Sequence, residues 1–187
     1  MRKIISICIL VLFCSCKENY TPKPKGFFKL DFPEKSFQQY NQDCPFTFQF
    51  PIYSKVEPLE KYCFFNLQFP EFDATLHMSY FPLSENLFMH VEESRNLAYK
   101  HTVKANAISE QPFISNTDKV FGLVYDYEGT TATALQFYLT DSTNHFFRGA
   151  LYFNTEVNDS IAPVSIFLQD DIKHLIESFR WIEKSES

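Results

Sequence analysis

Short segments in which aromatic and polar side chains alternate, each closed by a proline, constrain the fold of this chain more than any other feature. Every second residue of 46–50 is a phenylalanine, and residues 63–69 and 74–80 also have one apolar and one polar face. A period of two with one apolar face is typical of a half-buried antiparallel strand. Proline ends such a strand because it lacks the N–H that the sheet ladder needs. The sequence therefore predicts an antiparallel sheet with a phenylalanine-rich core.

Two other segments have the periodicity of a helix. Residues 84–100 have Ser84 as the expected N-cap and an expected apolar stripe of Leu87, Phe88, Val91, Leu97 and Ala98. Residues 168–179 have apolar side chains at helical spacing, and Asp170 and Asp171 are expected near the start of that helix, where its dipole favours acids. Further strands are expected over 108–115 and 120–128, with a hairpin formed by 133–140 and 146–154. The turn of this hairpin is expected at 141–144, where all four residues are turn-forming types.

This order of elements predicts an α+β fold, an antiparallel β-sheet with a mid-chain helix and a C-terminal helix packed on it. The same order over residues 44–182 resembles the PsbP-like arrangement. Glycine is scarce, with 4 glycines against 22 phenylalanines, and no glycines have the spacing of a dinucleotide-binding loop or a P-loop. Both phosphate cradles need closely spaced glycines, so both are excluded.

The N-terminus predicts export and a lipid anchor. Arg2 and Lys3 precede an apolar run at 4–13 that is too short to span a bilayer, and Cys16 follows a small residue. This pattern is typical of a lipoprotein signal cut before Cys16, which then carries diacylglycerol and an N-acyl chain such as palmitate. An ordinary cleaved signal peptide and a hydrophobic first strand are the alternatives. The expected organisation is a signal peptide at 1–15, the lipidated cysteine and a flexible tether at 16–26, and a single domain at 27–187.

The charge of the chain narrows the class of partner. The net charge is −6, and removal of residues 1–15 makes it −8 because that segment contains two basic residues and no acid. An acidic chain argues against a nucleic-acid partner and against a polybasic contact with anionic lipid. The lipid is then the membrane attachment, and the domain is expected to stand off the bilayer, facing either the periplasm or the cell surface.

Two cysteines, Cys44 and Cys63, remain in the mature chain beyond the lipidated one. An even pair in an oxidising compartment predicts a disulfide, with two buried free thiols as the alternative. No Cys-x-x-Cys pair and no cysteine–histidine cluster has metal-ligand spacing, so neither a metal nor a cofactor is expected.

Catalytic groupings do not stand out. The motifs of zinc proteases and of the nucleophile elbow are missing, and the five histidines are isolated in the sequence. Asp126 and Glu128 on one strand, and His174 on the last helix, are the residues on which an envelope enzyme or a glycan-binding groove would depend. A solvated polar face is the simpler interpretation of these residues.

Three aromatic residues point away from the predicted core. By alternation, Phe64, Phe81 and Phe146 lie on the opposite face of the sheet, where each is either covered by a helix or exposed to a protein partner. They are the candidate partner-contact residues of the domain.

The sequence also resembles a known family. The run 22–34, directly after a lipid-bearing cysteine, is similar to the N-terminal signature of the gliding motility lipoprotein GldD family. Residues 43–51 and 63–67 are similar to the paired cysteine strands of that family, and residues 178–181 to its C-terminal helix end.

The resemblance implies a cell-envelope lipoprotein, expected at the outer membrane, that is needed for gliding motility. It implies contacts with other gliding-motility or type IX secretion envelope proteins, and no enzymatic activity. Cys16 as the lipid site, and Cys44 with Cys63 as a bridge, are the only residues whose roles transfer from the family.

Overall fold

The computed structural model describes residues 31–100, 105–129, 131–154 and 161–182. The elements below belong to one compact unit, residues 32–187. Cys16 and the expected signal and tether, residues 1–26, lie outside the described residues.

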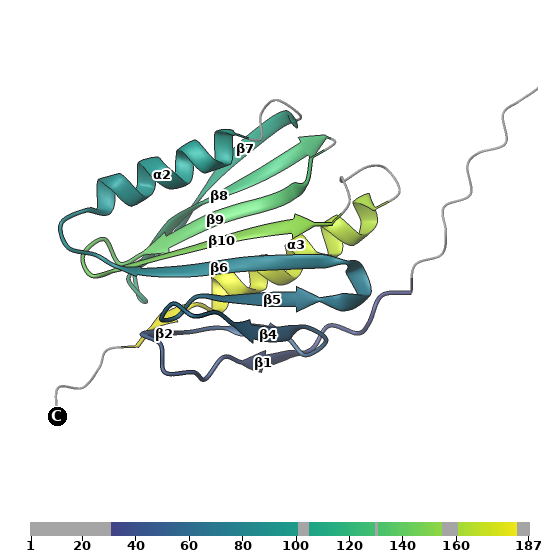
Figure 1. Ribbon diagram of the computed structural model, residues 1–187, viewed down its shortest axis with the longest axis horizontal. Coiled ribbons are helices and arrows are strands. Elements are labelled where there is room, and N and C mark those ends of the chain that lie inside the picture. Colours follow the sequence, from purple (N-terminus) through teal and green to yellow (C-terminus); the bar gives the residue numbers. More distant parts are fainter. Residues whose placement is uncertain (1–30, 101–104, 130, 155–160, 183–187) are drawn as a thin grey trace, which may run out of the picture. The chain divides into compact units, whose positions relative to one another are not determined.

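The central element is a seven-stranded sheet in which every neighbouring pair is antiparallel (Figure 1). Its spatial order is β4 (Lys55–Pro58), β5 (Phe65–Phe69), β6 (Ala74–Pro82), β10 (His145–Phe153), β9 (Thr133–Thr140), β8 (Val120–Gly129) and β7 (Ala105–Ser115).

Two helices, α2 (Leu87–Tyr99) and α3 (Ala162–Ser178), cover opposite faces of the sheet. Phe146 and Phe147 are adjacent on β10 and therefore point to opposite faces. The Phe146 ring stacks on His90 of α2, whereas the Phe147 ring lies 5.1 Å from that of Phe179 at the end of α3. This arrangement confirms the predicted α+β fold with a mid-chain helix and a C-terminal helix on an antiparallel sheet.

Four short strands lie outside the central sheet. β1 (Phe37–Gln39) pairs with β3 (Gln49–Pro51), and β2 (Phe46–Thr47) pairs with β11 (Arg180–Trp181), which follows α3. The alternating segment at 46–50 is thus divided between two small sheets. Its phenylalanines nevertheless enter the core beside α3, as the alternation predicts, with Phe46 and Phe48 fully buried.

The core between the sheet and α3 is a stack of aromatic rings. Phe48 lies 4.7 Å from Tyr40 and 6.1 Å from Phe65, and Phe46 lies 4.8 Å from Phe147. Offset and tilted ring pairs at these distances add to the free energy of area burial. Gly149 on β10 belongs to the same layer, because a Cβ there would lie 2.3 Å from the Phe137 ring. The glycine therefore lets that ring lie flat across the sheet.

The buried face of α2 differs from the prediction. The helix begins after Asn86 rather than at Ser84, and its buried residues are His90, Ser94 and Ala98. Phe88, expected in the apolar stripe, is 78% exposed. The reason is the surface beneath the helix, which already consists of aromatic rings, so that small side chains allow the close approach.

The start of α3 also differs from the prediction. The helix begins at Ala162 with a proline in its first turn, which places Asp170 and Asp171 in the middle of the helix and not near its positive end. Asp171 is buried, forms an ion pair of 3.1 Å with Lys35, and accepts a hydrogen bond from Tyr53. Burial raises the pKa of Asp171, and the contacts with Tyr53 and Lys35 oppose that shift. A buried carboxylate needs such partners, so Lys35 fixes the start of the domain to α3.

Candidate interaction surface at the disulfide end

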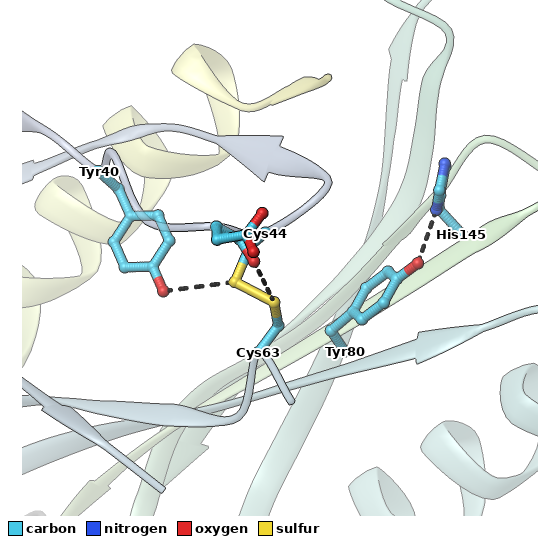
Figure 2. The surroundings of a disulfide bond; sticks show 6 residues. Tyr40, Cys44, Cys63, Tyr80 and His145 are labelled. Carbon is cyan, nitrogen blue, oxygen red and sulfur yellow. Dashed lines mark hydrogen bonds between the residues drawn. A yellow bond between two sulfur atoms is a disulfide. The ribbon is translucent and has the colours of Figure 1, made fainter. Parts of the chain in front are cut away.

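The disulfide joins the loop before β2 to the loop between β4 and β5. Cys44 and Cys63 are bonded, the pairing that the cysteine count predicts (Figure 2). The hydroxyl of Tyr40 lies 3.8 Å from Cys44 Sγ, so the core borders the bridge directly. The bridge holds the loop 59–64 against the N-terminal strands, and we refer to this part of the molecule as the disulfide end.

The loop 59–64 exposes apolar side chains beside a cavity. Leu59 is 46% exposed and Tyr62 is 54% exposed. The cavity has a volume of about 470 Å³, and its lining includes Tyr40, Cys44, Val56, Leu59, Tyr62 and Phe64. Exposed apolar side chains beside a concavity are typical of a protein contact site.

The three predicted contact residues have different surroundings. Phe146 is 1% exposed beneath α2, so for this residue the covered alternative holds. The rings of Phe64 and Phe81 meet edge to face at 5.2 Å, and both side chains are half-buried. Lys61 lies 5.2 Å from the centre of the Phe64 ring. Phe64 and Phe81 therefore extend the exposed surface of Leu59 and Tyr62 towards α2.

A row of rings connects the disulfide end to the turn of the β9–β10 hairpin. Tyr62 lies 6.2 Å from Tyr80, and the Tyr80 hydroxyl is 2.8 Å from His145 Nδ1 (Figure 2). Burial raises the pKa of Tyr80 to about 12, so its hydroxyl stays protonated at neutral pH. His145 stacks on Trp181 of β11 at 4.9 Å. The row thus runs from the β4–β5 loop to the last described strand.

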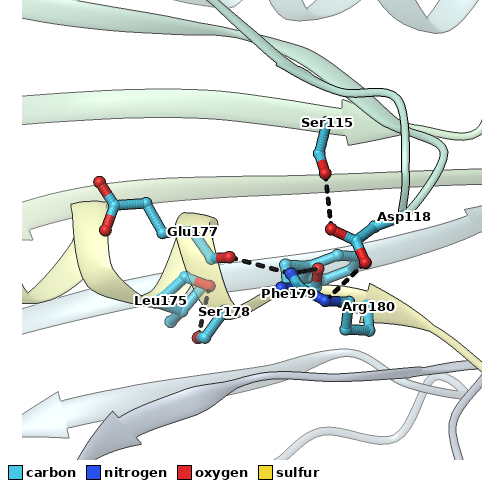
Figure 3. Close-up of polar contacts among 7 residues, drawn as sticks. All are labelled: Ser115, Asp118, Leu175, Glu177, Ser178, Phe179 and Arg180. Carbon is cyan, nitrogen blue, oxygen red and sulfur yellow. Dashed lines mark hydrogen bonds and ion pairs between the residues drawn. The ribbon is translucent and has the colours of Figure 1, made fainter.

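A second cavity, of about 410 Å³, lies beyond this row. It is bounded by the β7–β8 turn, the β9–β10 turn and the segment 180–182, and we refer to it as the hairpin-end cavity. The guanidinium of Arg180 forms a 2.8 Å ion pair with Asp118, and its Nη1 donates to the carbonyls of Glu177 and Phe179 (Figure 3). The ion pair therefore joins the β7–β8 turn to the segment after α3, which are far apart in the sequence.

The residues considered for catalysis are not assembled into a site. Asp126 is half-buried on β8, burial raises its pKa, and Lys173 opposes that shift. His174 stacks on Phe37 and bonds to Gln49 at 2.8 Å. Among the described residues, no hydrogen bond or ion pair joins Asp126, Glu128 and His174. In the same part of the chain, no three histidine, cysteine or acidic residues form a group that could hold a metal ion.

Sequence reasoning missed the hairpin-end cavity. It predicted the turn at 141–144 from its composition, but nothing local to Asp118, Arg180 or Trp181 indicates that they meet. Their contact depends on where β11 lies after α3, which is decided by the buried Phe179 and by pairing with β2. The single tryptophan two residues after the predicted helix was the only available signal.

The described chain begins at the other end of the sheet. Phe32 stacks on Phe167 of α3 at 4.5 Å and lies 6.2 Å from Phe72, in the turn η2 (Pro70–Phe72). β5 separates that turn from Cys63, because the strand runs from Phe65, after the disulfide, to Phe69. The disulfide end and the entry of the chain therefore lie at opposite ends of the domain (Figure 1).

Comparisons with known proteins identify the family. No protein with a curated description matches the chain. The family model described as gliding motility lipoprotein GldD matches residues 17–181, which include both bridged cysteines and both helices. None of the helices within the described ranges is long and apolar enough to cross a membrane. The match extends over most of the sequence, and the chain therefore belongs to the family of gliding motility lipoproteins GldD.

Proposed function

We propose that this chain is a non-enzymatic lipoprotein of the outer membrane that supports the assembly or stability of the gliding and type IX secretion machinery through protein contacts. Residues 1–15 are its signal peptide, Cys16 carries the lipid, residues 16–26 are the tether and residues 27–187 form the domain. The observation that carries the proposal is the exposed apolar surface of Leu59, Tyr62, Phe64 and Phe81 beside a cavity, at the end of the domain opposite the entry of the chain.

This geometry suits a tethered contact protein. The chain enters beside Phe32, so a domain anchored at Cys16 can direct its disulfide end away from the bilayer. The tether contains two prolines, which favour an extended backbone of roughly 3.1 Å per residue. An apolar surface at the end of the domain opposite Phe32 is available to neighbouring proteins.

Substitutions on the surface test the proposal. Leu59→Ser with Tyr62→Ser removes exposed apolar area without opening the core, whereas Phe88→Ser makes a similar change on the outer side of α2. We expect cells with the double variant to lose most of their gliding motility. After detergent extraction, the variant should recover about one fifth or less of the other motility proteins that the wild type recovers, since few residues dominate such contacts. The Phe88→Ser variant should behave as wild type, at equal protein abundance in membranes.

The same experiment separates the proposal from an enzymatic function. Alanine at Asp126, Glu128 and His174 should leave gliding intact, and Cys16→Ala should move the protein out of the membrane fraction. Normal gliding and normal co-purification in the Leu59→Ser, Tyr62→Ser variant would contradict the proposed surface. Loss of gliding only with the three alanine variants would favour a catalytic or glycan-binding domain.

A further inference from the structure

The hairpin-end cavity has walls of two kinds. On one side His145 and Trp181 are stacked, and Ile182 is 43% exposed beside them. On the other side lie the polar turn residues of β7–β8 and β9–β10. A concave site with an apolar wall and a few convergent polar groups has the general features of a ligand site. The polar groups decide which ligand fits.

Both acids at the cavity are engaged in contacts within the chain. Asp141 Oδ1 accepts from the backbone N–H groups of Thr143, Asn144 and His145, and its Oδ2 accepts from the Thr143 hydroxyl. These bonds lower the pKa of Asp141, although its partial burial raises it. Asp118 accepts from the Ser115 hydroxyl and from Arg180 Nε. Asp141 therefore stabilises the β9–β10 turn, and Asp118 joins the β7–β8 turn to Arg180.

The groups without a protein partner are mainly donors. Arg180 Nη2 and Lys119 Nζ make no hydrogen bond or ion pair within the described part of the chain. The His145 ring uses Nδ1 towards Tyr80, which leaves Nε2, and the indole N–H of Trp181 is buried without an acceptor among these residues. Arg180 and Lys119 balance the charges of Asp118 and Asp141, but the N–H groups of Nη2 and Nζ remain available and favour an acceptor with negative charge.

The guanidinium is held in place before any ligand arrives. Its Nε is fixed by Asp118 and its Nη1 by two backbone carbonyls, so Nη2 has a defined direction (Figure 3). Arginine held in this way loses little side-chain entropy on binding.

Lys119 adds a second, independent observation. Its backbone has a φ of 51°, in the left-handed region that glycine would occupy at no cost. A lysine at such a turn position is strained relative to glycine, and no contact with the described residues offsets this strain. The turn directs the exposed Lys119 side chain from the lining of the cavity, where its ammonium group is available to a ligand.

We propose that the hairpin-end cavity binds a carboxylate of an acidic peptide segment of a protein partner, with Arg180 and Lys119 as the anion-binding residues and His145 with Trp181 as the wall for a neighbouring apolar side chain. The inference rests on the proposed function, because it assigns a partner chemistry to the same end of the domain. The chain as a whole is acidic, with a net charge of −6. Affinity therefore comes from these local contacts and not from long-range attraction.

The single tryptophan of the chain provides a direct test, because Trp181 lines the cavity. The full chain in detergent is titrated with acetyl-Asp-Leu-Asp-Leu-amide and with the matched acetyl-Asn-Leu-Asn-Leu-amide, and tryptophan fluorescence is recorded. We expect a saturable change with the aspartate peptide and at least tenfold weaker binding of the asparagine peptide. Sodium acetate should compete only at far higher concentration than the peptide.

Variants locate the site. Lys119→Gln and Arg180→Gln should each weaken binding of the aspartate peptide at least fivefold, and Lys55→Gln, the same change of charge at an exposed position of β4, should not. Arg180→Gln also removes the ion pair with Asp118 and can therefore disturb folding. Lys119→Gln removes no contact with the described residues, so it tests the proposal even if the Arg180→Gln variant does not fold. Equal binding of the two peptides, unchanged binding by Lys119→Gln, or stronger competition by inorganic phosphate than by acetate would overturn the proposal.

Cells distinguish this inference from the proposed function. Combined Lys119→Gln and Arg180→Gln should reduce gliding when protein abundance is unchanged. Normal gliding in that variant, together with loss of gliding in the Leu59→Ser, Tyr62→Ser variant, would remove the role of the cavity and leave the proposed function standing.

Discussion

The two faces of the central sheet are stabilised in different ways. On the α3 face, the rings of Phe46, Phe48, Phe65 and Phe147 form one continuous core, and the disulfide closes its edge. On the α2 face, the buried residues of the helix are a histidine, a serine and an alanine. The core cluster on the α3 face is larger than the cluster of Ala98, Tyr125 and Tyr127 on the α2 face. We therefore expect the α3 face to contribute more to the stability of the domain and α2 to be the less firmly attached element.

Adjacent phenylalanines on β10 give the largest expected effect. Phe147→Ala removes a ring from the core and should lower the free energy of unfolding by about 4 kcal/mol. Phe146→Ala should cost roughly half as much, because α2 can settle onto the space that the ring leaves, whereas the strands and α3 cannot. Urea denaturation of both variants measures the difference. Equal losses would show that the two faces are equally well packed.

The disulfide is the next largest contribution and belongs to the α3 face. Replacing Cys44 and Cys63 together by serine should lower the free energy of unfolding by about 3 kcal/mol, since the bridge closes a loop with a sequence separation of 19 residues. Chemical denaturation of the variant and of the reduced wild type should give the same value. A loss well below 1 kcal/mol would mean that strand pairing already restricts this loop.

Hydrogen exchange compares the helices directly. The amides of α2 should open with a free energy at least about 2 kcal/mol below that of the α3 amides, which corresponds to roughly thirtyfold faster exchange. Native-state exchange followed by mass spectrometry of peptides from 87–99 and 162–178 measures this. If the two helices exchange together, they form one cooperative unit and the comparison between the faces fails.

A single carboxylate gives the smallest expected effect. Burial raises the pKa of Asp126, so the folded state holds its proton more tightly than the unfolded state. The contribution of this group to stability is therefore greatest at acid pH and is lost as the pH rises through its folded pKa towards neutrality.

Asp126→Asn removes that dependence. The variant should be more stable than wild type at pH 7 by up to about 1 kcal/mol, and the difference should shrink towards acid pH. Thermal denaturation over a pH series tests the sign. Lower stability of the variant at pH 7 would show that the Lys173 charge outweighs the burial.

The α3 face was predictable from the sequence because its signal is local. Alternation and terminal prolines correctly identify β5 and β6 and their buried residues, and the turn composition at 141–144 correctly predicts the β9–β10 hairpin. Each of these signals lies within one strand or one turn, where side-chain direction follows directly from position in the chain.

The α2 face and the candidate sites were less predictable because they depend on tertiary contacts. The hydrophobicity of Phe88 predicts that it lies on the buried face of α2. Ser94 and Ala98 lie on that face instead, because the surface beneath the helix consists of aromatic rings. The predicted position of Asp171, near the start of the helix, is wrong. The proline in the first turn of α3 marks an earlier start, at Ala162. The hairpin-end cavity combines three distant segments, and no spacing in the sequence indicates that they meet.

The position of the disulfide has a mechanical consequence if the chain is tethered as proposed. Tension on the chain would enter at Phe32 and first act on the Lys35–Asp171 pair and the short pairing of β1 with β3. Once those contacts yield, force reaches Cys44, whose covalent bond to Cys63 transfers it to the loop before β5. If the proposed contact surface at 59–64 bears the load, the bridge keeps the chain between Cys44 and Cys63 from being extended, and this surface keeps its shape.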